Sequence, residues 1–191
     1  LAAVRAVAAG ELEHAANFAG GLHHAAVNRA SGFCIYNDIA VAIAWLRREL
    51  DCRVAYVDLD VHHGDGVQWG FYEDPDVLTL SIHESGRFLF PGTGEIGEIG
   101  EGRARGTSVN IPLLPHTAGD DWLECLEMVL PDVLEAFRPD IIISQHGCDT
   151  HRLDPLAHLA VSVDATERAP RLIHRLAHEQ CGGRWVALGG G

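Results

Sequence analysis

Short apolar segments alternate with longer amphipathic segments along this chain, and the alternation predicts strands that take turns with helices. Four runs rich in apolar and β-branched residues are expected to be strands: 53–58, 77–82, 140–144 and 184–188. A fifth short strand is expected over 107–113, where Pro112 stops it. Because three of the main runs are nearly all apolar, they indicate strands that are buried on both faces of a sheet.

Helices are expected between these strands, over residues 1–9, about 38–50, 120–137 and 165–181. Asn37 and Asp38 fit the start of the second helix, because their side chains can accept hydrogen bonds from its first backbone N–H groups. Pro131 is expected to kink or split the third helix, and the fourth is expected to break or restart near Pro170. Residues 17–34 and 85–107 are expected to be loops, and loops as long as the second are usually functional or disordered.

This order of elements predicts an α/β fold, with an open, mostly parallel sheet and helices on both of its faces. The chain has 191 residues, which is enough for one domain with a sizeable core. The sequence contains no internal repeat, low-complexity tract or linker, so residues 1–191 are expected to form a single domain.

Composition excludes several classes of protein. The net charge is −13 and the sequence pI is near 5.2, whereas direct nucleic-acid binding needs a basic surface. Polar residues or glycine interrupt every apolar run, so no membrane span is expected, and no signal peptide is visible at Leu1. The five cysteines are an odd number with no Cys-x-x-Cys pair. They indicate free thiols in a reducing compartment, and we expect a cytoplasmic location.

Metal-capable side chains follow the predicted strands, where ligands of open α/β sheets bind. Asp58, Asp60 and His62 are spaced i, i+2 and i+4, and on an extended chain this spacing brings them to one side. Asp149 follows the third strand and is the natural third ligand beside Asp60 and His62. The alternative is that the two aspartates cap the strand end and His62 is an ordinary surface residue. The attached Gly64-Asp65-Gly66 favours the metal site.

Two adjacent histidines, His23 and His24, lie in the loop 20–25. Imidazole titrates near neutral pH, so the pair suits general acid–base catalysis, and each ring needs a carboxylate to fix its tautomer. Asp58 and Asp65 are the candidates for that role. A pair of histidines by itself is more often a solvated loop feature, so this interpretation depends on the neighbouring metal ligands.

Phe33 and Phe90 lie in Gly-rich loops. They could wall a narrow slot that suits an alkyl chain with a polar end group, or they could anchor their loops to the core. Composition leaves these alternatives open.

Seven motifs together resemble those of the histone deacetylase superfamily, and they occur in family order over nearly the whole chain. They are Gly-Gly-Leu-His-His-Ala (20–25), Ser-Gly-Phe-Cys-Ile-Tyr-Asn-Asp (31–38), Asp-Leu-Asp-Val-His-His-Gly-Asp-Gly (58–66), Ser-Ile-His (81–83), Phe-Pro-Gly-Thr-Gly (90–94), Asn-Ile-Pro-Leu (110–113) and His-Gly-Cys-Asp-Thr (146–150). The nine-residue block 58–66 is highly specific. Residues 146–156 look most like the bacterial acetoin-utilisation type of this superfamily.

The resemblance implies a set of roles within the open α/β sheet of arginases and deacetylases. Asp60, His62 and Asp149 would hold zinc, with iron as the alternative metal. His23 and His24 would be the acid–base pair, backed by Asp58 and Asp65 respectively. Gly32 would offer its backbone to the substrate, and Phe33 and Phe90 would form the acyl-lysine tunnel. A potassium ion is also implied, at residues that match the family's site: Asp58, Asp60, His62, Ser81 and Ile82.

The resemblance further implies that the chain is a fragment lacking both ends of the catalytic domain. The family's Gly run is followed by a Tyr that donates a hydrogen bond to the developing oxyanion, but here Gly191 is the last residue. An N-terminal portion with the first strand and a substrate-gripping acidic loop is also expected to be missing. We therefore expect weak or no activity from these 191 residues alone.

The expected reaction is hydrolysis of an N-acetyl amide, in an acetyl-lysine protein or a related acetylated amine, with release of acetate. His24 is the expected general base, although two neighbouring histidines titrate as a pair and can share roles. One rival is an arginase-like ureohydrolase with two manganese ions, which would need close carboxylates at the third strand, whereas Asp149 and Asp154 are five residues apart. The other rival is a non-catalytic acyl-lysine-binding module, against which the intact histidine pair argues.

Overall fold

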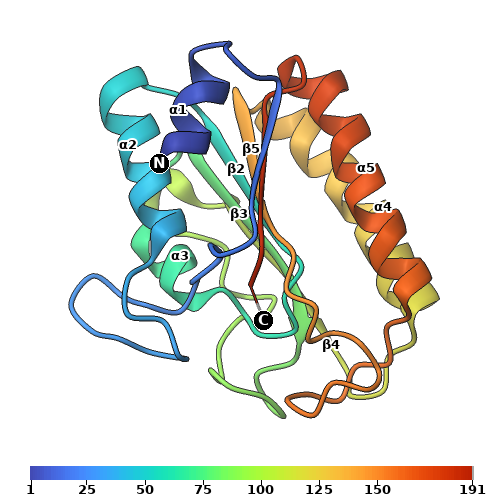
Figure 1. Ribbon diagram of the computed structural model, residues 1–191. Helices are drawn as coiled ribbons and strands as arrows, with labels where there is room; N and C mark the ends of the chain where they lie inside the picture. Colours follow the sequence, from blue (N-terminus) through green and yellow to red (C-terminus); the bar gives the residue numbers. More distant parts are fainter. Residues whose placement is uncertain (191) are drawn as a thin grey trace.

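Six parallel strands form the centre of the molecule, in the order β1-β6-β5-β2-β3-β4. The computed structural model describes residues 1–190. The strands are β1 (His14–Asn17), β2 (Val54–Asp58), β3 (Val77–Glu84), β4 (Ser108–Leu113), β5 (Ile141–Gln145) and β6 (Trp185–Leu188). The helices are α1 (Ala2–Ala8), α2 (Asp38–Leu50), α3 (Asp65–Gly70), α4 (Gly119–Phe137) and α5 (Val163–Cys181), with a 3-10 turn at Gly102–Ala104. Figure 1 shows the arrangement.

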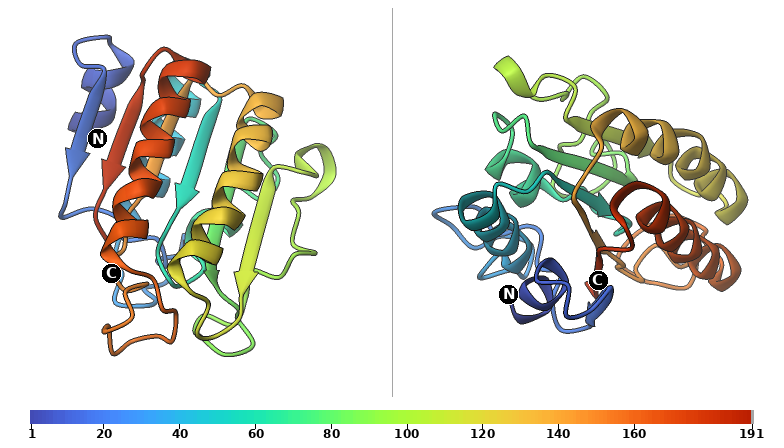
Figure 2. Two further views of the ribbon diagram at one scale, coloured as in Figure 1. Left: turned by 90° about the vertical axis from the view of Figure 1, so that its right-hand side faces the viewer. Right: turned by 90° about the horizontal axis from the view of Figure 1, so that it is seen from above.

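The sheet is covered on both faces. Helices α1 and α2 pack on one face, and the longer α4 and α5 pack on the other, as the view from above shows (Figure 2). Alternate residues of β2 divide between the two cores: Ala55 and Val57 pack with α4 and α5, whereas Val54 and Tyr56 pack with α1 and α2. Burial on both faces explains why this strand is almost wholly apolar, and it confirms the predicted open parallel α/β fold.

Strand β1 was not predicted. Its sequence, His-Ala-Ala-Asn, has neither an apolar run nor an alternating pattern, because β1 is an edge strand that pairs with β6 on one side, among residues 1–190, and buries little of its surface. Pro112 does not stop β4 but lies within it. This strand is the opposite edge of the sheet, where a residue without an N–H group is tolerated.

The two prolines within predicted helices do not interrupt them. Helix α4 continues through Pro131 and α5 continues through Pro170. Leu130 and Leu134 flank the first proline and are fully buried, and Ala169 and Ile173 flank the second in the same way. Tertiary packing of these flanking residues outweighs the local cost of a missing N–H, so the expected breaks were wrong.

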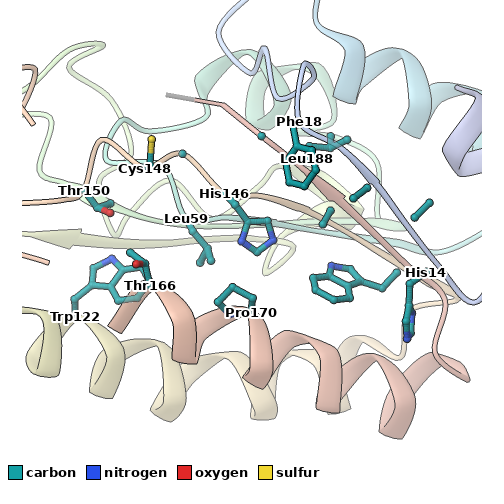
Figure 3. A pocket seen from close by; sticks show the side chains of 16 residues that line it. His14, Phe18, Leu59, Trp122, His146, Cys148, Thr150, Thr166, Pro170 and Leu188 are labelled. Carbon is teal, nitrogen blue, oxygen red and sulfur yellow. The ribbon is translucent and has the colours of Figure 1, made fainter. Parts of the chain in front are cut away.

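None of the helices within residues 1–190 is both long and apolar enough to cross a membrane. The five cysteines have free thiols. A cavity of about 590 Å³ lies between α5 and the sheet, with an apolar lining that includes Leu59, Pro170 and Trp185 (Figure 3). His14 of the edge strand lies at one end of this cavity.

Candidate active site

The candidate site lies at the carboxyl ends of β2 and β5, which are neighbours in the middle of the sheet. Strand β2 leads into the segment that carries Asp60 and His62, and β5 leads into the segment that carries Asp149. A backbone hydrogen bond from Leu59 N to the Gln145 carbonyl continues the pairing beyond the strand ends. Sheet topology therefore brings together ligands that are nearly ninety residues apart.

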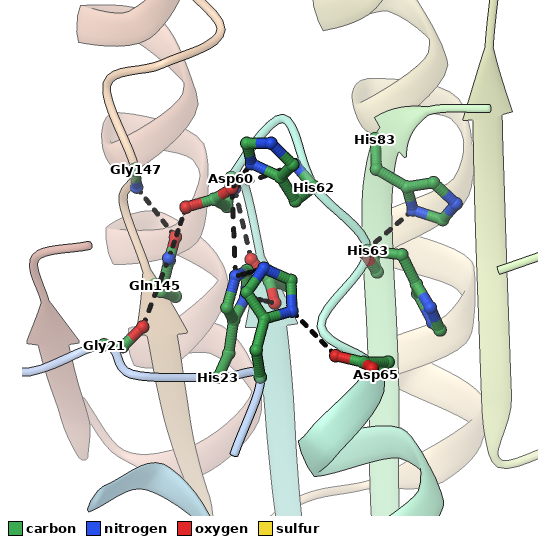
Figure 4. Close-up of polar contacts among 12 residues, drawn as sticks. Gly21, His23, Asp60, His62, His63, Asp65, His83, Gln145 and Gly147 are labelled. Carbon is green, nitrogen blue, oxygen red and sulfur yellow. Dashed lines mark hydrogen bonds and ion pairs between the residues drawn. The ribbon is translucent and has the colours of Figure 1, made fainter. Parts of the chain in front are cut away.

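Asp60, His62 and Asp149 converge on one point. Figure 4 shows Asp60 and His62 side by side. Nδ1 of His62 lies 3.0 Å from Oδ1 of Asp60 and 3.0 Å from Oδ2 of Asp149. The second oxygen of each carboxylate is held from behind: Gln145 Nε2 donates to Asp60 Oδ2 at 2.7 Å, and Val61 N donates to Asp149 Oδ1 at 3.0 Å. These donors fix the two carboxylates with one oxygen each turned towards His62.

The surroundings of this cluster favour a positive charge. Burial by itself would lower the pKa of His62, but the hydrogen bonds that its ring donates to Asp149 and Asp60 outweigh burial and raise the pKa to about 10. Burial, with the nearby Asp60 charge, raises the pKa of Asp149 to about 6. Two crowded carboxylates and one imidazole nitrogen are donors that zinc accepts. The residues present therefore fit a divalent metal ion.

His23 and His24 lie beside this cluster, and their rings are held in the same manner. Nδ1 of His23 lies 2.7 Å from Oδ2 of Asp58, and Nδ1 of His24 lies 2.7 Å from Oδ1 of Asp65. Each Nδ1–H donates to its carboxylate, so both Nε2 atoms are left for chemistry. They are 3.0 Å apart, which is a hydrogen bond only if one of them carries a proton. The pair is therefore built to hold one shared proton.

Charge favours protonation of His23. Burial lowers its pKa, but the carboxylates of Asp58 and Asp60 outweigh burial and raise the pKa to about 9. Nε2 of His23 lies 3.8 Å from Oδ1 of Asp60, so the pair and the metal-capable cluster belong to one electrostatic unit.

Tyr56 and Gln145 support the site and were missed by the sequence analysis. The Tyr56 hydroxyl donates to Oδ2 of Asp58 at 2.6 Å, and both side chains are buried. Gln145 bridges Asp60 and the backbone N of Gly147, at 2.7 Å in each case. The signal was present, since Tyr56 precedes Asp58 by two residues on a strand and so shares its side. For both residues the clue was a polar group within an otherwise apolar strand, the hydroxyl of Tyr56 in β2 and the amide of Gln145 in β5.

Two glycines allow the close packing of the site. Gly32 has a φ of +48°, and a β-carbon there would overlap the His24 ring. A β-carbon at Gly147 would overlap the Asp60 carboxylate. Only glycine fits these positions with the ring and the carboxylate where they are.

A cavity of about 310 Å³ opens onto these groups, and its lining includes Phe33 and Phe90. The Phe90 ring centroid lies 5.0 Å from that of His24 and 6.3 Å from that of His62. Phe90 is 47% exposed and Phe33 is 98% exposed, so neither anchors its loop to the core. Leu89 packs against the core instead. The two aromatic rings thus stand at the opening of the cavity.

A second polar network positions the loop that carries Phe90. His63 contacts the Thr93 hydroxyl at 2.8 Å and Gln68 Oε1 at 3.1 Å, and Gln68 in turn donates to Glu98 at 2.7 Å. Glu98 also accepts from Gly94 N at 3.0 Å. Sequence reasoning assigned no role to this network, because its members are spread over residues 63–98 and do not share one motif.

Of the residues predicted to bind potassium, Asp60 and His62 belong to the metal-capable cluster, and Ser81 and Ile82 lie on the neighbouring strand β3. Ser81 is paired with Asp58 across β2 and β3, and its hydroxyl contacts His83 Nδ1 at 2.9 Å. Ile82 is fully buried in β3. The potassium site stays a prediction.

Comparison with known proteins places the chain in a family. The model of the histone deacetylase domain matches residues 1–191, and the chain belongs to that family. The chain is 55% identical over 185 residues to the acetoin utilization protein AcuC of Bacillus subtilis (strain 168), and 45% identical to that of Staphylococcus aureus (strain COL). Each match covers 97% of this chain and 48% of the relative, so the chain spans about half the length of these proteins.

Solved structures agree. An HDAC homolog from Aquifex aeolicus has a TM-score of 0.87 and 40% identity, covering 92% of this chain and 46% of that one. A structure of an HDAC homolog complexed with SAHA gives a TM-score of 0.86 with the same identity and coverage. The histone deacetylase-like fold and the resemblance to the acetoin-utilisation type are thereby confirmed.

Proposed function

We propose that this chain carries the catalytic centre of a metal-dependent deacetylase that hydrolyses an N-acetyl amide, releasing acetate and a free amine. The observation that carries the proposal is the pair His23 and His24, each backed by a carboxylate at 2.7 Å, beside a cluster of three metal-capable residues. A core histidine needs one partner, but two rings with their Nε2 atoms turned together at a cavity suit proton transfer.

The metal would be held by Asp60, His62 and Asp149, with zinc as the proposed ion and iron as the alternative. When bound, it would polarise the acetyl carbonyl and lower the pKa of a water molecule. A potassium ion would be bound by five residues, partly through backbone carbonyls: Asp58, Asp60, His62, Ser81 and Ile82. Its charge would partly neutralise the buried carboxylates.

The chain's own residues would move the protons. In the hydrolysis, the oxygen of water forms a bond to the acetyl carbon, the C–N bond breaks, and a proton is delivered to the amine. His24 would accept the proton of water at Nε2 while Asp65 stabilises the imidazolium that forms. His23, held by Asp58 and already protonated, would give its Nε2 proton to the leaving amine as His24 takes up the proton of water.

The cavity suits an acyl-lysine side chain. Phe90 and Phe33 would flank its methylene groups, and the backbone of Gly32 would hold the substrate near His24. The proposed partner is an acetylated protein or acetylated amine, with no direct contact to nucleic acid or membrane, and the proposed location is the cytoplasm. The net charge of −13 favours a basic substrate of this kind.

The two rival functions have less support. An arginase-like site would need carboxylates for a second ion at this edge, and within the described chain the cluster there consists of Asp60, His62 and Asp149, without Asp154. A non-catalytic binding module would have no use for two carboxylate-backed imidazoles.

The test is His24→Ala in the natural full-length protein, with acetate release from an acetyl-lysine peptide and metal content measured together. We expect kcat to fall by at least about 10²-fold while the metal stays bound, since His24 acts on protons and is not a ligand. An unchanged kcat, or loss of the metal, would overturn the assignment of His24 as base.

A further inference from the structure

A second cluster of imidazoles lies away from the candidate active site. His14 begins the edge strand β1, and His174 and His178 lie on successive turns of α5. Their Nε2 atoms form a triangle with sides of 3.0, 3.2 and 3.2 Å. We propose that these three histidines bind a zinc ion that fastens strand β1 to helix α5.

Hydrogen bonding does not account for this triangle. A neutral imidazole nitrogen either carries a proton or offers one lone pair, so among three nitrogens at mutual contact at least one pair must be alike. Two facing lone pairs, or two facing N–H groups, repel each other. A cation at the centre removes the conflict, because all three lone pairs then point to it.

The size of the triangle matches metal coordination. At a Zn–N distance of about 2.1 Å, two nitrogens on one face of an octahedron are about 3.0 Å apart, and two in a tetrahedron are about 3.4 Å apart. The observed sides of 3.0 to 3.2 Å lie between these values. Imidazole ligands suit zinc, copper and nickel, and zinc accepts either geometry with water in the open positions.

Two elements, β1 and α5, supply the histidines of the cluster, and β6 supports it. The i, i+4 spacing puts His174 and His178 on one face of α5, and their exposed side chains leave room for water. Trp185 of β6 supports the cluster, with its ring 5.9 Å from those of His14 and His174. Gly183 has a φ of +83° and lets the turn before β6 pass close to the His178 ring.

The ring of His14 directs its polar contacts to this cluster. Its Nδ1 is buried without a hydrogen-bond partner among residues 1–190, whereas its Nε2 faces both helix histidines. The 590 Å³ cavity ends at His14 (Figure 3). A bound ion would thus join the edge strand to α5 across the end of this cavity.

Such a link would stabilise the fold. It would connect residues 160 and 164 positions apart, and closing so long a loop removes much conformational freedom from the unfolded chain. The edge strand β1 has a single strand partner among the described residues, so it gains most from a second attachment.

The test measures zinc bound per chain in the natural full-length protein after dialysis against low-micromolar zinc, together with the midpoint of thermal unfolding. We expect two zinc ions in the wild type, one in His174→Ala/His178→Ala, one in Asp149→Ala and none when these changes are combined. Zinc should still raise the midpoint of thermal unfolding of Asp149→Ala. When His174→Ala/His178→Ala is combined with Asp149→Ala, zinc should no longer raise that midpoint.

Arg171→Ala/Arg175→Ala is the matched control, because it truncates two exposed residues of the same helix without removing an imidazole. It should keep both ions. His174 and His178 are exposed, so their replacement should leave the fold intact, and circular dichroism checks this. If Asp149→Ala binds no zinc, or the histidine variant binds as much as the wild type, there is no second site. Loss of both ions in Asp149→Ala alone would instead favour a two-metal active site.

Discussion

Asp65 accepts a hydrogen bond from Nδ1 of His24 at 2.7 Å, and the two residues come from segments 41 positions apart. Asp65 is the first residue of α3, directly after the segment that carries Asp60 and His62. The turn that follows β2 therefore supplies two of the three metal-capable residues and the carboxylate that orients the proposed base. The proposed acid–base and metal chemistry thus shares one short stretch of chain.

This relationship predicts the effect of Asp65→Asn. The amide cannot stabilise an imidazolium and can favour the wrong tautomer, so kcat should fall by about 10²–10⁴-fold with the metal retained. Asp132→Asn, an exposed change on α4, is the control and should leave kcat unchanged. Equal activity of the two variants on an acetyl-lysine peptide would show that Asp65 does not act through His24.

Gly32→Ala should displace the His24 ring. The added β-carbon would overlap that ring, so we expect kcat to fall at least about tenfold, as small misplacements of catalytic groups do. Gly102→Ala separates overlap from backbone strain, because Gly102 has a similar φ of +56° but open space around it. Gly102→Ala should cost about 1 kcal/mol of stability and no activity. A comparable loss of kcat in both variants would contradict the proposed overlap.

Tyr56→Phe should destabilise the protein. It removes the hydroxyl that donates to the buried Asp58 at 2.6 Å, and a hydrogen bond to a charged group contributes about 1.5–3 kcal/mol. Urea unfolding of Tyr56→Phe and of the partly exposed control Tyr72→Phe measures the difference. If Tyr56→Phe lowers the free energy of unfolding no more than the control does, water or another donor must satisfy Asp58.

The protein should lose stability in mild acid because two histidines, the buried His83 and the partly buried His146, are held in neutral form. Burial lowers the pKa of His83 to about 3 and that of His146 to about 4. Nε2–H of His83 donates to the Gly94 carbonyl at 3.0 Å, so its Nδ1 accepts from Ser81 and has no site for a proton. The unfolded chain takes up protons first as pH falls below about 6.5, so stability present above that pH is lost towards pH 4.

Each of these histidines should contribute a slope of up to about 1.4 kcal/mol per pH unit in this window. His83→Asn, which can still donate to Gly94, should reduce the slope, whereas the exposed control His116→Asn should not. Free energies of unfolding from urea titrations between pH 4 and 7 provide the comparison. An identical slope in the wild type and His83→Asn would exclude the buried neutral imidazole as its source.

The sheet was predictable where burial dictates composition. Strands β2, β3 and β5 are buried on both faces, so their apolar sequences identify them, and the residues that follow them mark the site. Strand β1 escaped prediction because an edge strand needs no such pattern. Pro131 and Pro170 led to predicted helix breaks that the structure does not have, because core packing of α4 and α5 outweighs the local effect of a proline.

The site was predictable to the extent that its residues share a strand end or a loop motif. Asp60 and His62 follow one strand, and Asp149 follows its neighbour, so topology joins them. The supporting contact of Gln145 with Asp60, and the cluster of His14 with α5, depend on the exact packing of elements distant in sequence. No spacing rule within a single segment reveals them.

The most direct test of the account is metal-dependent acetate release by the natural full-length protein in a His174→Ala/His178→Ala background, which leaves the active-site ligands alone. A chelator should abolish hydrolysis of an acetyl-lysine peptide, and one equivalent of zinc or iron should restore it. The same protein with Asp149→Ala should neither bind the ion nor regain activity. Hydrolysis that survives chelation, or that returns in the Asp149→Ala protein, would contradict the proposed metal-dependent deacetylase.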